Sequence, residues 1–174
     1  MKICYLILET DKPVRESAHY LRGFFGNEFR DIPLMHHHLD DDVGYIYNYP
    51  RIQYKILEGV PFVVGIAEGA KALSNIADEI KALKLNGSSY NIECITKRLY
   101  ECDPKPSFHN INYKFVTDWL PLNQKNLRKY YFIKNHQERK EFLNNILVGN
   151  VLSFCKGFGI VCKTPIHAHT HIDS

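Results

Sequence analysis

The sequence predicts an α+β protein with the element order β-α-β-β-α-β, the order of a ferredoxin-like (RRM-like) sandwich. Two observations carry this prediction. Apolar runs of strand length alternate with amphipathic segments of helical spacing, and the dipeptide Glu58-Gly59 joins two of the runs as a hairpin. The chain has 174 residues, of which 45% are hydrophobic. This is enough for a compact core in one domain or two small ones.

The first predicted elements are a strand and a helix. Residues 3–8, ICYLIL, form a continuous apolar run that favours a central strand buried on both faces. Pro13 suits the first turn of a following helix. One face of that helix carries the apolar residues Val14, Ala18, Leu21 and Phe25.

The middle of the chain predicts a hairpin, a second helix and a fourth strand. After a loop from about Gly26 to Gly44, Pro50 marks a break before a strand at 52–57. The second helix is predicted from apolar residues at helical spacing: Leu73, Ile76, Ala77, Ile80 and Leu83. An alternating strand follows over 90–102, so both helices are expected on one face of the sheet.

Residues 103–107, DPKPS, are the best candidate linker because two prolines oppose both helix and strand there. We therefore expect an N-terminal ferredoxin-like domain at 1–103 and an abbreviated, related domain at 108–174. The second domain is predicted to contain a strand within 111–122, a helix from about Gln137 to Cys155, and a strand over 160–172 broken by Pro165.

Composition excludes several classes of protein. No apolar run approaches the ~20 residues of a membrane-spanning helix, and the N-terminus lacks a cleavage signature, so we expect a cytoplasmic protein without a membrane partner. Five cysteines form no C-x-x-C pair and are interpreted as packed thiols. The net charge of +3 permits an anionic partner but does not identify one.

The stretch GNVLSFCKGFGIV, residues 149–161, is rich in glycine and has two interpretations. Gly157 could supply the left-handed residue that ends a helix, while Gly159 eases entry into a strand. Alternatively, the bare backbone lets N–H groups approach phosphates, with Lys156 adding a positive charge.

The sequence also resembles a known family. ILVGNVLSFCKGFGIV is similar to the C-terminal glycine-rich loop of the RAMP superfamily, the RNA-binding proteins of CRISPR systems. LMHHHLDDDVGYIYNYPRIQYKILEGVPFVVGIAEG and DWLPLNQKN resemble the b-type branch of the Cas-six family of CRISPR RNA-processing endoribonucleases. The resemblance implies ferredoxin-like domains that cleave CRISPR repeat RNA without a metal or other cofactor. It leaves open whether other CRISPR effector subunits or a second copy of the chain take part.

In this family a ribose 2′-hydroxyl attacks the adjacent phosphorus, leaving a cyclic phosphate and a free 5′-hydroxyl. His36 and His38 match the two histidines of the family signature, and histidine suits both proton transfers because its ordinary pKa is about 6.5. Two alternatives stay open for this segment. The histidines and the following aspartates, Asp40 to Asp42, could form a solvated loop or a divalent metal site.

RNA contacts are expected from two further places. Arg51 and Lys55 share one strand face and could lie along an RNA backbone, or they could form a solvent-facing edge. Lys156, Gly157 and Gly159 are the other expected RNA-binding residues. A row of terminal histidines, His167, His169 and His171, could hold a metal or a phosphate or could be a plain exposed strand, and no role is assigned to it.

Three other functions compete with the endoribonuclease. They are a RAMP protein that binds RNA without cutting it, a metal-dependent nuclease or phosphodiesterase, and a ferredoxin-like regulatory domain that binds a small metabolite. Salt dependence separates the last of these from the RNA-binding functions. Binding of RNA through its phosphates weakens as the salt concentration rises, whereas a metabolite-binding domain would show no such RNA affinity.

Overall fold

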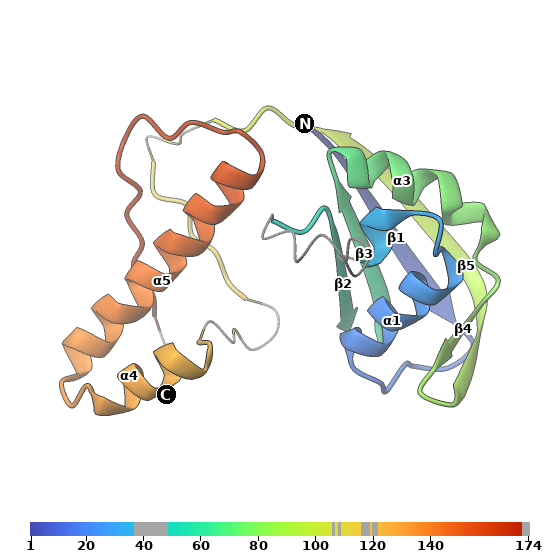
Figure 1. Ribbon diagram of the computed structural model, residues 1–174, viewed down its shortest axis with the longest axis horizontal. Helices are drawn as coiled ribbons and strands as arrows, with labels where there is room; N and C mark the ends of the chain where they lie inside the picture. The colour runs from blue at the N-terminus through green and yellow to red at the C-terminus, as the bar shows by residue number, and fades with distance from the viewer. Residues whose placement is uncertain (37–48, 106, 108, 116–118, 120–121, 172–174) are drawn as a thin grey trace, which may run out of the picture. The chain divides into compact units, whose positions relative to one another are not determined.

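The computed structural model describes residues 1–36, 49–105, 107, 109–115, 119 and 122–171. The chain divides into two compact units, Met1–Lys105 and Pro106–Ser174 (Figure 1). Each is considered by itself. Among the described residues, no helix combines the length and apolar content that a membrane crossing requires.

The first unit contains a five-stranded antiparallel sheet with the strand order β2-β3-β1-β5-β4. The strands are β1 (Lys2–Thr10), β2 (Ile52–Leu57), β3 (Val60–Ile66), β4 (Ala82–Leu85) and β5 (Ser88–Glu101). The helices are α1 (Ala18–Glu28), α2 (Pro33–His36) and α3 (Glu68–Ile76), which continues into a 3-10 turn, η1 (Ala77–Glu79). The predicted ferredoxin-like order is confirmed here, with β4 added at one edge.

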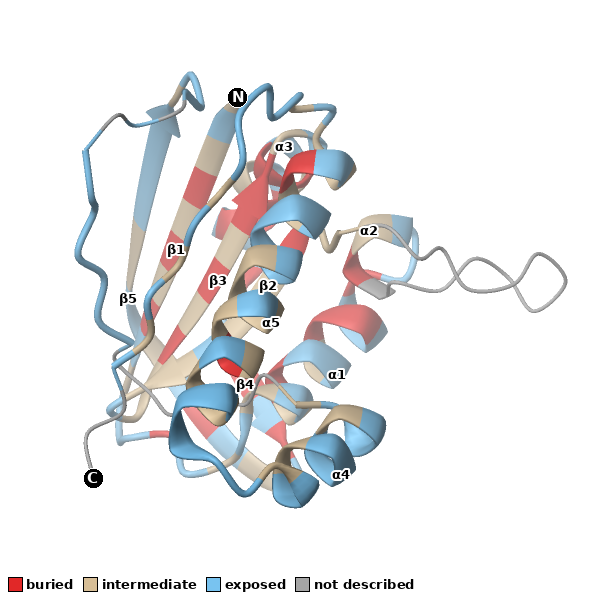
Figure 2. Cartoon of the chain, turned by 90° about the vertical axis from the view of Figure 1, so that its left-hand side faces the viewer, coloured by how far each residue is buried: buried red, intermediate tan, exposed pale blue. Residues whose placement is uncertain are grey.

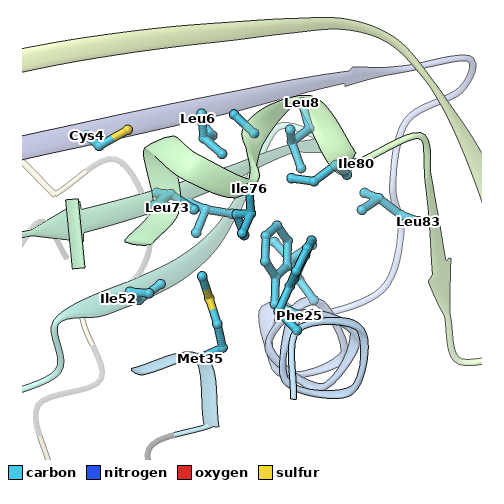
Figure 3. Packing of buried hydrophobic residues seen from close by; sticks show 14 of the residues in the cluster. Cys4, Leu6, Leu8, Phe25, Met35, Ile52, Leu73, Ile76, Ile80 and Leu83 are labelled. Atoms are coloured by element: carbon cyan, nitrogen blue, oxygen red, sulfur yellow. The ribbon is translucent and has the colours of Figure 1, made fainter. Parts of the chain in front are cut away.

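The core of the first unit lies between the sheet and the helices α1 and α3, which cover one sheet face (Figure 1). In β1, Cys4, Leu6 and Leu8 are completely buried on this face. They pack near Phe25 of α1 and Leu73 of α3 (Figure 3). The alternate residues of β1 are only half-buried, so the expectation that this strand is buried on both faces was wrong.

The first helix begins later than the sequence predicts. Val14 is buried in the core but lies in an extended segment, because its N–H donates to the Gly59 carbonyl at 2.8 Å. The helix starts only after Ser17, which is its N-cap residue. An apolar residue at helical spacing was therefore part of the core without being part of the helix.

The second predicted helix is shorter than expected. It ends at Ile76, and Leu83 belongs to β4. Asn86 and Gly87 both have positive φ, at 46° and 85°, which suits the two-residue turn of the β4–β5 hairpin. This local turn chemistry makes residues 82–85 the first strand of a hairpin and ends the helical pattern before it.

The second unit contains α4 (Gln124–Phe132) and α5 (His136–Gly157), each with an asparagine at its N-cap. The described parts of the two predicted strands, residues 111–115 and 160–171, form no strand. Apolar side chains in these segments, such as Ile111 and Val161, are largely exposed. A strand needs a neighbouring strand to pair with, and no strand of the described part of the chain pairs with these segments.

Candidate nucleic-acid interface

His36 is the last residue of the short helix α2. The preceding residue, Met35, is 1% exposed and belongs to the core cluster. The backbone at His36 is therefore held next to a buried anchor. The other histidine of the predicted pair, His38, lies outside the described residues, as does the Asp40 to Asp42 run of the alternative metal site.

Tyr54 connects the β2 strand to α2. Its hydroxyl donates to the Met35 carbonyl at 3.4 Å and lies 3.5 Å from the Met35 sulfur. Its ring lies 5.3 Å from that of Phe25. Burial raises the pKa of the Tyr54 phenol, and the charge of Arg22 offsets part of this effect. The raised pKa favours the neutral phenol, whose hydroxyl is the hydrogen-bond donor that ties α2 to the sheet.

Arg51 and Lys55 differ in their surroundings. The Arg51 Nε lies 2.9 Å from a Glu68 carboxylate oxygen, and its side chain is 19% exposed. The Arg51 carbonyl also accepts from the N–H of Ile66, at the end of β3, at 2.8 Å, and it packs against Gly69 of α3. Lys55 is exposed on β2. Of the two cations, Lys55 is the more accessible to a ligand, while Arg51 already has a carboxylate partner.

The sheet face opposite the helices carries aromatic and basic side chains that the sequence did not single out. Tyr5 of β1 lies opposite Arg98 of β5, and the Tyr5 and Tyr100 rings meet edge to face at 5.6 Å. These three residues line a shallow hollow with Ile3 and Ile7. The alternation of ICYLIL carries the relevant signal, since Tyr5 cannot share a face with Cys4 and Leu6. The strand register was needed to bring Arg98 beside it.

The glycine-rich stretch ends α5 in a Schellman motif. The Ile160 N–H donates to the Cys155 carbonyl at 2.8 Å and the Gly159 N–H to the Lys156 carbonyl at 3.2 Å. Gly159 has the left-handed conformation, with φ at 67°, whereas Gly157 is the last helical residue. The left-handed residue expected at Gly157 is therefore found two positions later.

This ending has a consequence for phosphate binding. The N–H groups of residues 158–160 donate to helix carbonyls, and the end of a helix carries a partial negative charge. Lys156, in the last turn, is exposed. An approaching phosphate would meet the Lys156 ammonium and a surface without a Cβ at Gly159, rather than a cradle of open N–H groups.

The terminal histidines alternate regularly with half-buried residues. His167, His169 and His171 are exposed, while Thr170 donates from its N–H and its hydroxyl to Asn144 of α5 at 2.7 and 2.8 Å. The three histidines therefore face the solvent, in a segment that is not a strand. No group of three potential metal ligands gathers among the described residues.

Two sequence families match the chain. The Cas6b N-terminal domain matches residues 1–101, and the Cas6b C-terminal domain matches residues 106–174.

Two individual proteins are also similar. An uncharacterised protein of Methanocaldococcus jannaschii is 32% identical over 84 residues, which is 48% of this chain and 56% of the relative. The chain thus matches little more than half the length of this curated relative. A crystal structure of Cas6b is 26% identical with a TM-score of 0.74, and the match covers 94% of this chain and 76% of that one.

The antiparallel ferredoxin-like unit and the matches along both units define a CRISPR-associated (Cas) protein. The chain belongs to the Cas6b family.

Proposed function

We propose that this protein is a CRISPR endoribonuclease that cuts precursor CRISPR RNA within its repeats, in the cytoplasm, by metal-independent attack of a ribose 2′-hydroxyl. The observation that carries the proposal is the match of Cas6b domains to both units of the chain. The similarity to a solved Cas6b over 94% of the chain supports it.

The reaction needs two proton transfers, which we assign to His36 and His38. One imidazole removes the proton of the 2′-hydroxyl as its oxygen bonds to phosphorus. The bond from phosphorus to the 5′-oxygen breaks, and the other imidazolium gives that oxygen a proton. The products are a 2′,3′-cyclic phosphate and a 5′-hydroxyl. No water molecule is consumed, and the two proton transfers need no metal. Each positioned acid or base contributes about 10²- to 10⁴-fold to such a reaction.

RNA binding is assigned to Lys55, Arg51 and the end of α5 at Lys156, Gly157 and Gly159. Lys55 is expected to contribute more than Arg51, because a phosphate must compete with Glu68 for the Arg51 guanidinium. At the end of α5, the Lys156 side chain is expected to supply the phosphate contact and the glycines to leave room for the RNA backbone.

The test compares the wild-type chain with the double variant His36→Ala/His38→Ala on labelled repeat RNA, in excess EDTA. The matched control is His109→Ala/His136→Ala, which removes two exposed histidines from the other unit. We expect the cleavage rate of the first variant to fall by at least 10³-fold with its RNA affinity within about threefold of wild type. The control should cut normally.

A second substrate isolates the chemistry. Repeat RNA with a 2′-deoxy ribose at the scissile position should bind but remain uncut. Cleavage of this substrate would rule out 2′-hydroxyl attack, and loss of cutting in EDTA would favour a metal-dependent nuclease. Tight binding of normal repeat RNA without any product would favour the non-cutting RNA-binding alternative.

A further inference from the structure

Helix α4 carries a cluster of cations that neither the sequence motifs nor the proposed site includes. Lys125, Arg128 and Lys129 recur at a spacing of three and four residues, and Phe132 continues the row one turn later. These four side chains line one surface hollow together with Asn123 and Gln124. We call this set of six residues the α4 face.

The α4 face is exposed and carries unbalanced charge. No residue of α4 is buried, and Figure 2 shows the helix as exposed or intermediate throughout. None of the three cations has an ion-pair partner in the part of the second unit that the structure describes. Like charges at this spacing weakly destabilise a helix, whereas an anion laid along the face would relieve that repulsion.

The helix is nevertheless well formed at both ends. The Asn123 side chain accepts from the Asn126 N–H at 2.9 Å, and the Ile133 N–H donates to the Lys129 carbonyl at 3.2 Å. Beyond it, Arg139 donates to the Ile133 carbonyl and stacks over the Tyr130 ring. The side chains of the three cations therefore take no part in the contacts that fix the two ends of the helix.

The aromatic residue identifies the kind of anion. Phe132 is 85% exposed and lies on the same face as the cations. The cation-bearing side of a helix that binds a membrane surface is free of apolar residues, whereas the exposed Phe132 lies among the cations of the α4 face. Cations beside an exposed aromatic ring are typical of sites for single-stranded nucleic acid, where phosphates meet the charges and a base stacks on the ring.

We propose that the α4 face binds a single-stranded segment of the RNA, with Lys125, Arg128 and Lys129 on successive phosphates and an unpaired base on Phe132. The row from Lys125 to Phe132 extends about 10 Å along the helix, at 1.5 Å per residue. This length corresponds to about three nucleotides at the rise of ~3.4 Å of a stacked strand. The inference rests on the proposed function and adds the place where RNA outside the cleavage site is held.

The charge test uses the full chain and fluorescent single-stranded repeat RNA over a range of salt concentrations. The variant Lys125→Gln/Arg128→Gln/Lys129→Gln is compared with Lys71→Gln/Lys81→Gln/Lys84→Gln, which removes the same charge from exposed positions of the first unit. We expect the α4 variant to lose about 10- to 100-fold in affinity near 0.1 M salt. Its slope of log affinity against log salt should fall by about two, as expected for three lost contacts to a single strand.

The stacking test replaces Phe132 by Ala and, separately, by Trp. Alanine should weaken binding of single-stranded RNA by about 5- to 100-fold, while tryptophan should preserve it. Circular dichroism confirms that the helices remain, as expected for such an exposed residue.

The outcomes separate the inference from the proposed function. If the wild-type chain binds and cuts repeat RNA while the α4 variant and the control have the same affinity and salt slope, the inference is wrong and the proposed function stands. Equal sensitivity of Phe132→Ala and Phe132→Trp would also count against stacking. If the wild-type chain neither binds nor cuts repeat RNA, the proposed function fails and the inference fails with it.

Discussion

The two units of the chain are stabilised in different ways. In Met1–Lys105, eighteen buried residues form one cluster between the sheet and its helices. In Pro106–Ser174, the buried apolar residues among those described are Leu143 and Cys155. Both helices of the second unit have side-chain caps at their N-termini, and α5 ends in a Schellman motif.

The exposed apolar surface shows the same contrast. Most of the large hydrophobic residues exposed on the described chain belong to the second unit: Ile111, Tyr113, Phe115, Leu127, Tyr131, Phe132, Val151, Leu152 and Val161. Substitutions at the buried core positions of the first unit should therefore act mainly on stability. Those at the exposed apolar positions of the second unit should act mainly on what its surface binds.

The largest expected effect comes from Leu73→Ala in α3. Leu73 is completely buried in the core cluster, so the substitution leaves a cavity and should lower the unfolding free energy of the first unit by about 4 kcal/mol. Hydrogen exchange of residues 1–105 in denaturant measures this change. The matched variant Leu152→Ala, at a position 45% exposed on α5, should cost less than about 1 kcal/mol. Similar losses of unfolding free energy in the two variants would contradict the difference between the units.

Two glycines sharpen the contrast by changing stability in opposite directions. A Cβ at Gly69 would lie 2.2 Å from the Arg51 carbonyl oxygen, so Gly69→Ala must separate α3 from the start of β2 and should cost about 3 kcal/mol. Gly149 lies inside α5 with nothing within 4 Å of such an atom, so Gly149→Ala should stabilise the helix by about 0.5–1 kcal/mol.

Unfolding of the two units can be followed separately in the Gly69→Ala and Gly149→Ala variants, because the single tryptophan, Trp119, belongs to the second unit. Its fluorescence reports unfolding there, while hydrogen exchange follows residues 1–105. Destabilisation by Gly149→Ala would mean that α5 has a close neighbour at this point.

The fold was predictable where local chemistry decides it. The Glu58-Gly59 hairpin is recovered because both residues adopt positive φ, at 51° and 81°, and this dipeptide suits such a turn. Leu83 was misassigned because a position at helical spacing is equally a strand position when a tight turn follows. The strands predicted within 111–122 and over 160–172 are not formed in their described parts for another reason, since alternation in sequence does not supply a pairing partner.

The candidate site was less predictable than the fold. Lys55 is exposed on β2, as both interpretations of its strand face require. The ion pair of Arg51 with Glu68 joins residues far apart in sequence, which no motif indicates. Tyr5 and Arg98 likewise become neighbours only through the β1–β5 register. The α4 face has a local signal in the sequence, the spacing of its cations, but it belongs to no motif that the chain shares with a known family.

A smaller effect is expected at Tyr54, where the first unit holds the histidine-bearing helix. Tyr54→Phe removes the donor to the Met35 carbonyl and should cost about 1 kcal/mol of stability. If this bond positions His36, the cleavage rate should fall several-fold while RNA affinity is unchanged. The control Tyr131→Phe, at a site 70% exposed on α4, should leave the rate unchanged. A normal rate for Tyr54→Phe, with the expected loss of stability, would limit Tyr54 to a structural role.

The smallest expected effect concerns pH and again separates the units. Hydrogen bonds from Ser88 and from Tyr90, whose hydroxyl lies 2.5 Å from the carboxylate, lower the pKa of Glu16 below its ordinary value of 4.5. A lowered folded-state pKa means that the ionised carboxylate stabilises the first unit above pH 4.5, and that this stabilisation disappears as the pH falls through the folded value.

The measurable quantity is the difference in urea midpoint between the wild-type chain and Glu16→Gln. It should be positive and constant near neutral pH and should shrink toward zero in acid, because a glutamine can still accept a hydrogen bond but carries no charge. Glu79→Gln, at an exposed position of η1, is the matched charge control and should show no such trend. The Trp119 signal should be the same in all three proteins. A pH-dependent difference in that signal would mean that acid acts on the second unit through the first, and the two units would then have to be treated as one cooperative structure.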